Sequence, residues 1–239
     1  MKNQSIENIL KASTAHPKEQ YKFCSMLFMV YLTALLGEMT IGYRMAKLEG
    51  LIVSGSAFIV PLTYFVGDIV TEVYGYKLAR KMIWTALLCE ILFVFALNIV
   101  VLLPHLKHAE YQHAYSILIP PMLRSMLADL ITIFSSEFIN VYIISKWKIL
   151  TRGRFYWLRS TCSTTIGVFA FSAIACIIAY SGIYTIKEII NSIFSSYLIC
   201  EAIIVCLSFF GVFIVRYLKR IESVDAYDIG INFNPFVIN

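Results

Sequence analysis

The chain has 239 residues, of which 59% are hydrophobic and 15% are charged, with a mean hydropathy of +0.74. Soluble domains average roughly 45–50% apolar and about 25% charged residues, so this composition excludes a single soluble core. The formal net charge of +5 is concentrated at helix ends, so it indicates membrane topology and not nucleic-acid binding. The sequence therefore predicts an all-α integral membrane protein.

Six apolar blocks approach the roughly 20 residues that a helix needs to cross a bilayer. They cover residues 23–43, 51–73, 82–103, 119–145, 160–181 and 190–217. The first 22 residues contain no apolar segment of a cleavable signal peptide, so we expect the first block to be retained as a helix. The predicted organisation is an N-tail (1–22), six transmembrane helices (23–217) and a C-tail (218–239). The C-tail places turn-forming residues between aromatics, and we expect it to cap one face of the bundle.

Lysine and arginine residues are distributed unequally between the two sides. Fifteen lie in the N-tail, the second loop, the fourth loop and the C-tail, whereas four lie on the opposite side. Positive residues in short loops mark the cytoplasmic side, so both termini are predicted to be cytoplasmic. The predicted location is a bacterial inner membrane, crossed several times.

Cysteines and histidines give little sign of chemistry. All six cysteines fall in predicted spans without a CxxC pair, which favours packing between helices. His105, His108 and His113 cluster in an outer loop at spacings that only weakly indicate a metal site. No cofactor is expected, and because HExxH, GxSxG, Walker A and Cys/His nucleophile motifs are absent from the sequence, no enzyme is expected either.

Two carboxylates end the second predicted span. Asp68 and Glu72 are four residues apart, so they share one helical face with Tyr64. Gly67 allows another group to approach closely. Pro61 is expected to kink or break this span, as happens around transporter cavities. The basic residues expected to neutralise Glu72 are Lys77, Arg80 and Lys81.

The fourth predicted span carries the longest polar stripe. It begins after Pro120 and Pro121, which suit a helix start. The stripe follows helical spacing and is flanked by Arg124 and Glu137; its members are Ser125, Asp129, Thr132, Ser136 and Asn140. Lipid cannot satisfy such groups, so we expect them to face a polar cavity.

Other polar groups leave more than one interpretation. In the fifth span, Ser163 and Gly167 form a pair of small residues that predicts close helix packing, while nearby hydroxyls could line a cavity. Glu38, Glu90 and Glu201 stand alone in their spans, and their role is left open. Taken together, carboxylates, amides, hydroxyls and aromatics suit a planar, hydrogen-bonding solute.

Residues 67–81 carry a recognisable motif: Asp68, Glu72, Tyr74-Gly75 and Ala79-Arg80. This motif resembles the signature of the queuosine precursor transporter family, also called vitamin uptake transporters. Further matches are Arg124, Trp157-Leu158-Arg159 with Ser163-Thr164, and Asp228 with the segment 232–236.

The resemblance implies six helices and import of a 7-deazaguanine base for tRNA modification. Candidates are 7-cyano-7-deazaguanine, 7-aminomethyl-7-deazaguanine and queuine. The resemblance and the polar stripes together give the expected substrate-binding residues: Tyr64, Asp68, Glu72, Arg124, Asp129, Ser136, Glu137, Asn140, Ser163 and Thr164. A homo-oligomer is left open.

The chain departs from the family pattern at several positions. Members typically have Gln and Asp where this chain has Glu137 and Asn140, Gln and Asp at Val168 and Phe171, and Lys at Glu201. These departures leave the particular 7-deazaguanine undecided. Two alternatives also remain: the substrate-binding subunit of an ATP-driven vitamin importer, and a membrane enzyme that uses buried carboxylates.

Overall fold

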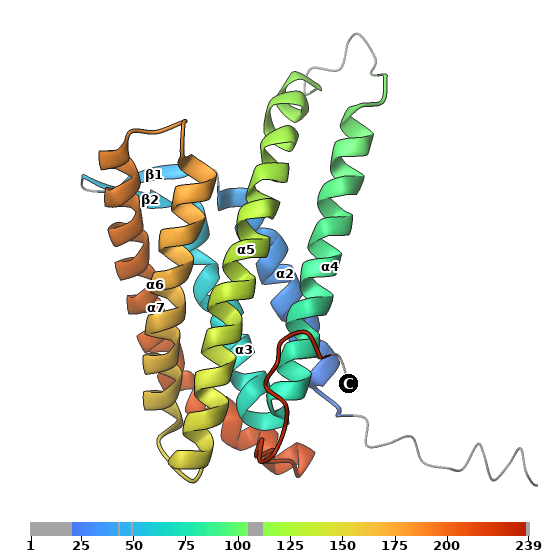
Figure 1. The fold of residues 1–239 in the computed structure, drawn as a ribbon, viewed down its shortest axis with the longest axis vertical. Helices are drawn as coiled ribbons and strands as arrows, with labels where there is room; N and C mark the ends of the chain where they lie inside the picture. Colours follow the sequence, from blue (N-terminus) through green and yellow to red (C-terminus); the bar gives the residue numbers. More distant parts are fainter. Residues whose placement is uncertain (1–20, 43, 49, 105–111, 238–239) are drawn as a thin grey trace, which may run out of the picture.

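The computed structural model describes residues 21–42, 44–48, 50–104 and 112–237. Figure 1 shows a bundle of helices with a small hairpin near one end and the C-terminal segment folded along the other. Within these residues, five helices are long and apolar enough to cross a membrane. They are α2 (Cys24–Gly42), α4 (Tyr76–Val101), α5 (Gln112–Leu150), α6 (Tyr156–Tyr180) and α7 (Ile186–Glu222).

The second predicted span, 51–73, is not a continuous helix. Its first part forms strand β2 (Leu51–Ser54), paired antiparallel with β1 (Met45–Leu48), and the 3₁₀ helix η1 (Gly55–Phe58). Only α3 (Val60–Tyr74) is α-helical, and its 15 residues extend about 22 Å, less than the hydrocarbon thickness. Pro61 lies in the first turn of α3, so the expected kink is instead the start of the helix.

Close backbone contact holds the segment before α3 against the end of α2. A Cβ atom at Gly55 would lie 2.5 Å from the carbonyl oxygen of Ile41, so only glycine fits between η1 and the end of α2. The Gly55 N–H donates to the carbonyl of Arg44 at 2.8 Å, which fixes the hairpin beside α2. Such irregular backbone is tolerated at membrane depth when protein surrounds it.

The predicted start of the fourth span is also wrong. Helix α5 begins at Gln112 and contains Pro120 and Pro121 within its first three turns. Both prolines are exposed, on the outer side of the helix. The helix therefore projects further than the apolar block alone indicated.

Both ends of the described chain lie at one end of the bundle, which we call the tail end; the opposite end, with β1 and β2, is the hairpin end. The carboxylate of Glu222, at the end of α7, accepts hydrogen bonds from the backbone N–H groups of Lys22 and Phe23 at 3.0 and 2.8 Å. It also accepts one from the Tyr74 hydroxyl at 2.9 Å. The first turn of α2 and the ends of α3 and α7 are thereby joined.

The C-terminal segment 223–237 packs along α3, α4 and α5, as expected for a cap. Asp228 accepts from the Tyr76 N–H at 2.9 Å and from the Ser145 hydroxyl at 2.6 Å. Arg80 donates to the carbonyls of Asn232 and Asn234 at 3.2 and 2.8 Å. Trp84 donates to the carbonyl of Pro235 at 2.7 Å. The expectation of a capping C-tail is confirmed.

Helix α6 packs closely against α3 and α5 at Gly167, which confirms the small-residue interpretation. A Cβ atom there would lie 2.9 Å from Cε1 of Tyr64 and 3.3 Å from the carbonyl oxygen of Ser136. Both neighbours are buried, and one of them is backbone. The three helices that carry most of the polar residues are therefore held together at this point.

We predict that Gly167→Ala lowers the free energy of unfolding by about 1–3 kcal/mol, because overpacking forces buried neighbours apart. Thermal unfolding of the purified protein in detergent measures the effect. The matched control is Gly37→Ala in α2, whose added Cβ would meet Ile59 at an ordinary 3.4 Å. Equal stability of the two variants would contradict the packing account.

Candidate functional site

A cavity lies in the hairpin half of the bundle, between α2, η1, α5, α6 and α7. Its empty space, including the opening toward solvent, is about 540 Å³. The volume that the centre of a water molecule can occupy is about 40 Å³. The latter holds about three water molecules. Its polar lining consists of Glu38, Ser54, Ser56, Ser125, Asp129, Ser172, Tyr180 and Ser196.

Two carboxyl groups enter this cavity from facing helices. Glu38 of α2 is 2% exposed and Asp129 of α5 is 9% exposed. Oε2 of Glu38 has no hydrogen-bond partner among the described residues. A buried carboxyl oxygen without a donor is costly, so this site is short of donors in the absence of a ligand.

Aromatic and hydroxyl groups complete the lining. The Tyr180 hydroxyl donates to the carbonyl of Gly42 at 2.5 Å and lies 2.9 Å from Oγ of Ser54, which joins α6 to the hairpin. The Ser54 N–H donates to Oγ of Ser196 at 3.1 Å. The ring of Phe171 meets that of Tyr64 edge to face, with centroids 6.4 Å apart. The cavity thus combines aromatic surface with acceptors.

The polar stripe of α5 is fully buried, as its spacing predicted, but it serves two regions. Ser125 and Asp129 line the cavity. Thr132 and Ser136 donate to carbonyls of their own helix at 2.5 and 2.7 Å. Asn140 lies on the tail side of the cavity, where it donates to Asp68.

Asp68 joins three helices through neutral donors. Oδ1 accepts from Nδ2 of Asn140 at 2.7 Å, and Oδ2 accepts from the hydroxyls of Ser160 and Thr164, the latter at 3.1 Å. Thr164 also reaches Oδ1 of Asn140 at 3.4 Å. Each oxygen of this carboxylate therefore has a protein donor.

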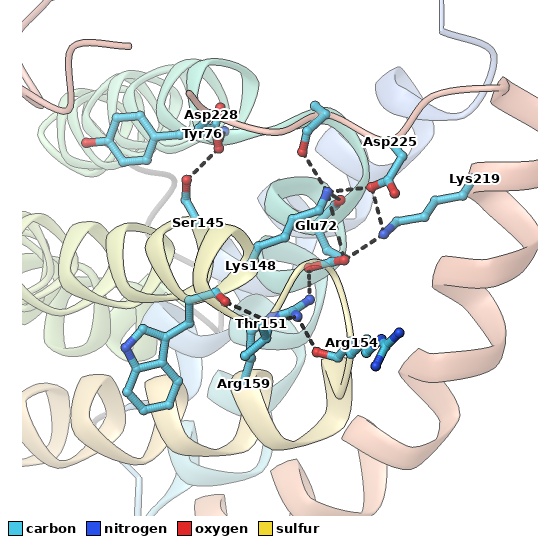
Figure 2. Close-up of polar contacts among 12 residues, drawn as sticks. Glu72, Tyr76, Ser145, Lys148, Thr151, Arg154, Arg159, Lys219, Asp225 and Asp228 are labelled. Carbon is cyan, nitrogen blue, oxygen red and sulfur yellow. Dashed lines mark hydrogen bonds and ion pairs between the residues drawn. The ribbon is translucent and has the colours of Figure 1, made fainter. Parts of the chain in front are cut away.

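Glu72 is the centre of an ion cluster at the tail end, shown in Figure 2. Its Oε2 lies 2.6 Å from Nη2 of Arg159, and its Oε1 lies 2.6 Å from Nζ of Lys219. Lys148 donates to the Glu72 carbonyl at 2.6 Å. Asp225 lies 2.6 Å from Lys148 and 2.8 Å from Lys219. The cluster comprises Glu72, Lys148, Arg159, Lys219 and Asp225 and draws on α3, α5, α6, α7 and the C-tail.

The expected partners of Glu72 were wrong. None of its ion pairs in the described structure involves Lys77, Arg80 or Lys81, and Arg80 binds carbonyls of the C-tail instead. The chain turns at Gly75 before α4 begins, so these side chains lie on a different helix from Glu72 and point away from it. Partial burial raises the pKa of Asp225, but hydrogen bonds and charges from Lys148 and Lys219 outweigh it and hold that pKa below its usual value.

The remaining expected residues lie outside the cavity lining. Arg124 donates to the carbonyls of Ile178 and Ser181 at 2.8 and 2.5 Å, where it caps the end of α6. Glu137 packs against Gly67, and its Oε2 has no partner among the described residues. Ser163 donates to the carbonyl of Ser160 at 3.1 Å. Of the ten expected substrate residues, Asp129 alone lines this cavity.

Several lining residues were not among the expected substrate residues. Glu38 was noted in the sequence without a role, and Tyr180, Ser172 and Ser196 were not singled out. Their helices place them at the cavity, yet single serines and one tyrosine in apolar runs carry no motif. His105 and His108 lie outside the described residues, and within the described part no cluster of His, Cys, Asp or Glu could hold a metal ion.

Comparison with known proteins identifies the family. Residues 54–215 match the family model described as "Putative vitamin uptake transporter", which covers more than half of the chain. The chain belongs to this transporter family. With its several apolar helices, it is a multi-pass protein of the bacterial plasma membrane.

One curated relative adds detail to the family match. It is the "Probable queuosine precursor transporter" of Bacillus subtilis (strain 168), 27% identical over 141 residues. The aligned part covers 59% of this chain and 62% of the relative, so the chain spans less than two thirds of that protein's length. No solved structure matches the chain.

The ion cluster predicts a large effect of a single substitution. Arg159→Gln leaves the fully buried Glu72 with one fewer close cation, so we expect a loss of about 3–5 kcal/mol in the free energy of unfolding. Thermal unfolding in detergent checks it. Arg220→Gln is the control, because Arg220 is exposed at the end of the same bundle. A small effect of Arg159→Gln, equal to that of the control, would contradict the stabilising role of the cluster.

Proposed function

We propose that this protein imports a 7-deazaguanine base, a queuosine precursor or queuine, for tRNA modification. Membership of a transporter family and the name of the Bacillus relative support the class of solute. The observation that carries the proposal is the cavity itself, where two buried carboxyl groups lie beside aromatic rings inside a membrane bundle.

The lining suits the chemistry of such a base. A deazaguanine presents a ring N–H and an exocyclic amino group on one edge, and both are donors. Asp129 and Glu38 supply carboxyl acceptors, and Oε2 of Glu38 has no donor among the described residues. Phe171 and Tyr180 offer ring faces, and the serine hydroxyls complement the remaining edge. We propose these residues as the substrate contacts, with Asp68, Glu137 and Tyr64 further along the same passage.

The geometry supports a transport cycle in which the bundle opens and closes. The cavity holds about three water molecules, so it must widen to admit a two-ring base. On the tail side, the passage is closed by the Asp68 contacts and then by the ion cluster around Glu72. We propose that these contacts form the inner gate and that they separate when the base is released.

The orientation follows from charge. We propose that the tail end faces the cytoplasm, because the basic residues gather there and positive residues are retained inside. The hairpin end then faces outward, next to the cavity. In this arrangement β2, η1 and α3 together make up the second of six membrane passages.

Uptake by the purified chain in proteoliposomes tests the proposal. Each of the three bases, carrying a radiolabel, is offered to vesicles that contain the wild-type protein alone. We expect saturable uptake of at least one of them, which unlabelled base competes away. Uptake of none would overturn the proposal, and uptake that requires added ATPase subunits would instead support the importer-subunit alternative.

We predict that Asp129→Asn lowers uptake about 10–100-fold, since hydrogen bonds to a charged group contribute about 1.5–3 kcal/mol. Asp68→Asn and Glu137→Gln are also expected to impair uptake while membrane insertion is retained. The control is Glu188→Gln, because Glu188 lies in the first turn of α7 and outside the cavity lining. Wild-type uptake by all three variants would remove these residues from the substrate passage.

A further inference from the structure

Glu90, near the middle of α4, has surroundings that a carboxyl group in a membrane rarely has. It is fully buried, and neither of its oxygens accepts a hydrogen bond from an amide, hydroxyl or basic group of the described residues. Its carboxyl group faces that of Asp129 on α5. The nearest group to one acid is thus a second acid.

Other titratable groups around Glu90 are also acidic. The carboxyl group of Glu90 acts electrostatically on Glu38 and Tyr31 of α2, and Glu137 of α5 also acts on both of them. All ion pairs among the described residues belong to the ion cluster at the tail end. None of these pairs includes Glu38, Glu90, Asp129 or Glu137. The hairpin half of the bundle therefore has carboxyl groups without counterions.

While this pair is shielded from water, ionising both facing carboxyl groups at once is strongly unfavourable. Desolvation and mutual repulsion favour the protonated form of one of them. A metal ion is a poor alternative to a proton at this pair, because hard cations need about six oxygen ligands. In the described part of the chain, no three acidic side chains lie close enough together to bind one ion. The ligand that fits this pair is a proton.

The position of the pair connects the proton to the solute. Asp129 lines the cavity, whereas Glu90 lies behind it and outside the lining. A base that donates to Asp129 favours the ionised form of that group, so the shared proton moves to Glu90. When the cavity opens to release the base, entering water solvates both carboxylates, and the proton can leave as well.

We propose that Glu90 carries a proton that enters and leaves together with the base, so that transport is proton-coupled symport. In the step, a hydronium ion donates one proton to a carboxylate oxygen and becomes water, and the same O–H bond breaks on release to water at the other side. One positive charge crosses with each base, in addition to any charge that the base itself carries. This inference rests on the proposed function, because it concerns the same cavity.

The test uses the full chain in proteoliposomes with the membrane potential held at zero by valinomycin and equal potassium. Labelled base is first measured in counterflow at equal pH on both sides. Accumulation is then measured with the outer medium one pH unit more acidic than the lumen. One-to-one symport predicts up to about tenfold accumulation per pH unit, which a protonophore abolishes.

The variants separate coupling from binding. Glu90→Gln should keep counterflow and lose acid-driven accumulation. Glu201→Gln, which removes a carboxyl group that accepts from Thr165 at 2.6 Å, should keep both. The proposal is overturned if accumulation by the wild type does not depend on the pH gradient. It is also overturned if Glu90→Gln shows the same acid-driven accumulation as the wild type. Absence of counterflow in the wild type instead counts against the proposed function.

A second measurement does not need the base. Dicyclohexylcarbodiimide adds to protonated carboxyl groups in apolar surroundings and leaves a stable adduct, with no group lost. We expect mass spectrometry to find the adduct on Glu90 or Asp129, formed more slowly as pH rises. No adduct on either residue at acidic pH, in a preparation whose other carboxyl groups react, would overturn the proton site.

Discussion

A charged group inside a bilayer must find its partner within the protein, and this constraint is met differently along the length of the bundle. At the tail end, Glu72 is surrounded by three cations from three helices. One turn further in, Asp68 is held by an amide and two hydroxyls. In the hairpin half, Glu38, Glu90 and Glu137 retain oxygens without donors. Among the described residues, ion pairs gather at one end, and carboxyl oxygens without donors lie toward the proposed solute cavity.

The sequence predicted those features that depend on neighbours along one helix. The stripe from Ser125 to Asn140 is buried because a period of 3.6 residues puts it on one face, and Gly167 packs closely because small residues permit it. The broken second span was not predictable in this way. Its hydropathy is continuous, and the close approach of Gly55 to the end of α2 is a contact between different segments.

The same distinction explains what was missed in the site. Glu72 was expected to pair with basic residues close in sequence, yet its cations lie 76, 87 and 147 positions away. Asp129 was found because it belongs to a stripe, whereas Tyr180 and Ser196 contribute to the cavity as isolated residues. Glu38 and Glu90 were visible as costly carboxyl groups, but their common neighbour, Asp129, appears only when α2, α4 and α5 are assembled.

We propose that the solute occupies the cavity between Glu38 and Asp129. Two native thiols allow occupation of this cavity to be measured directly. Cys176 and Cys200 line this cavity, whereas Cys206 is exposed on the outside of α7. In a chain whose other cysteines are replaced by serine, labelling of each thiol by N-ethylmaleimide is followed by mass spectrometry with and without 7-cyano-7-deazaguanine, 7-aminomethyl-7-deazaguanine or queuine. We expect that at least one base slows labelling of Cys176 and Cys200 but not of Cys206. Unchanged labelling of both cavity thiols under saturating amounts of a transported base would contradict it.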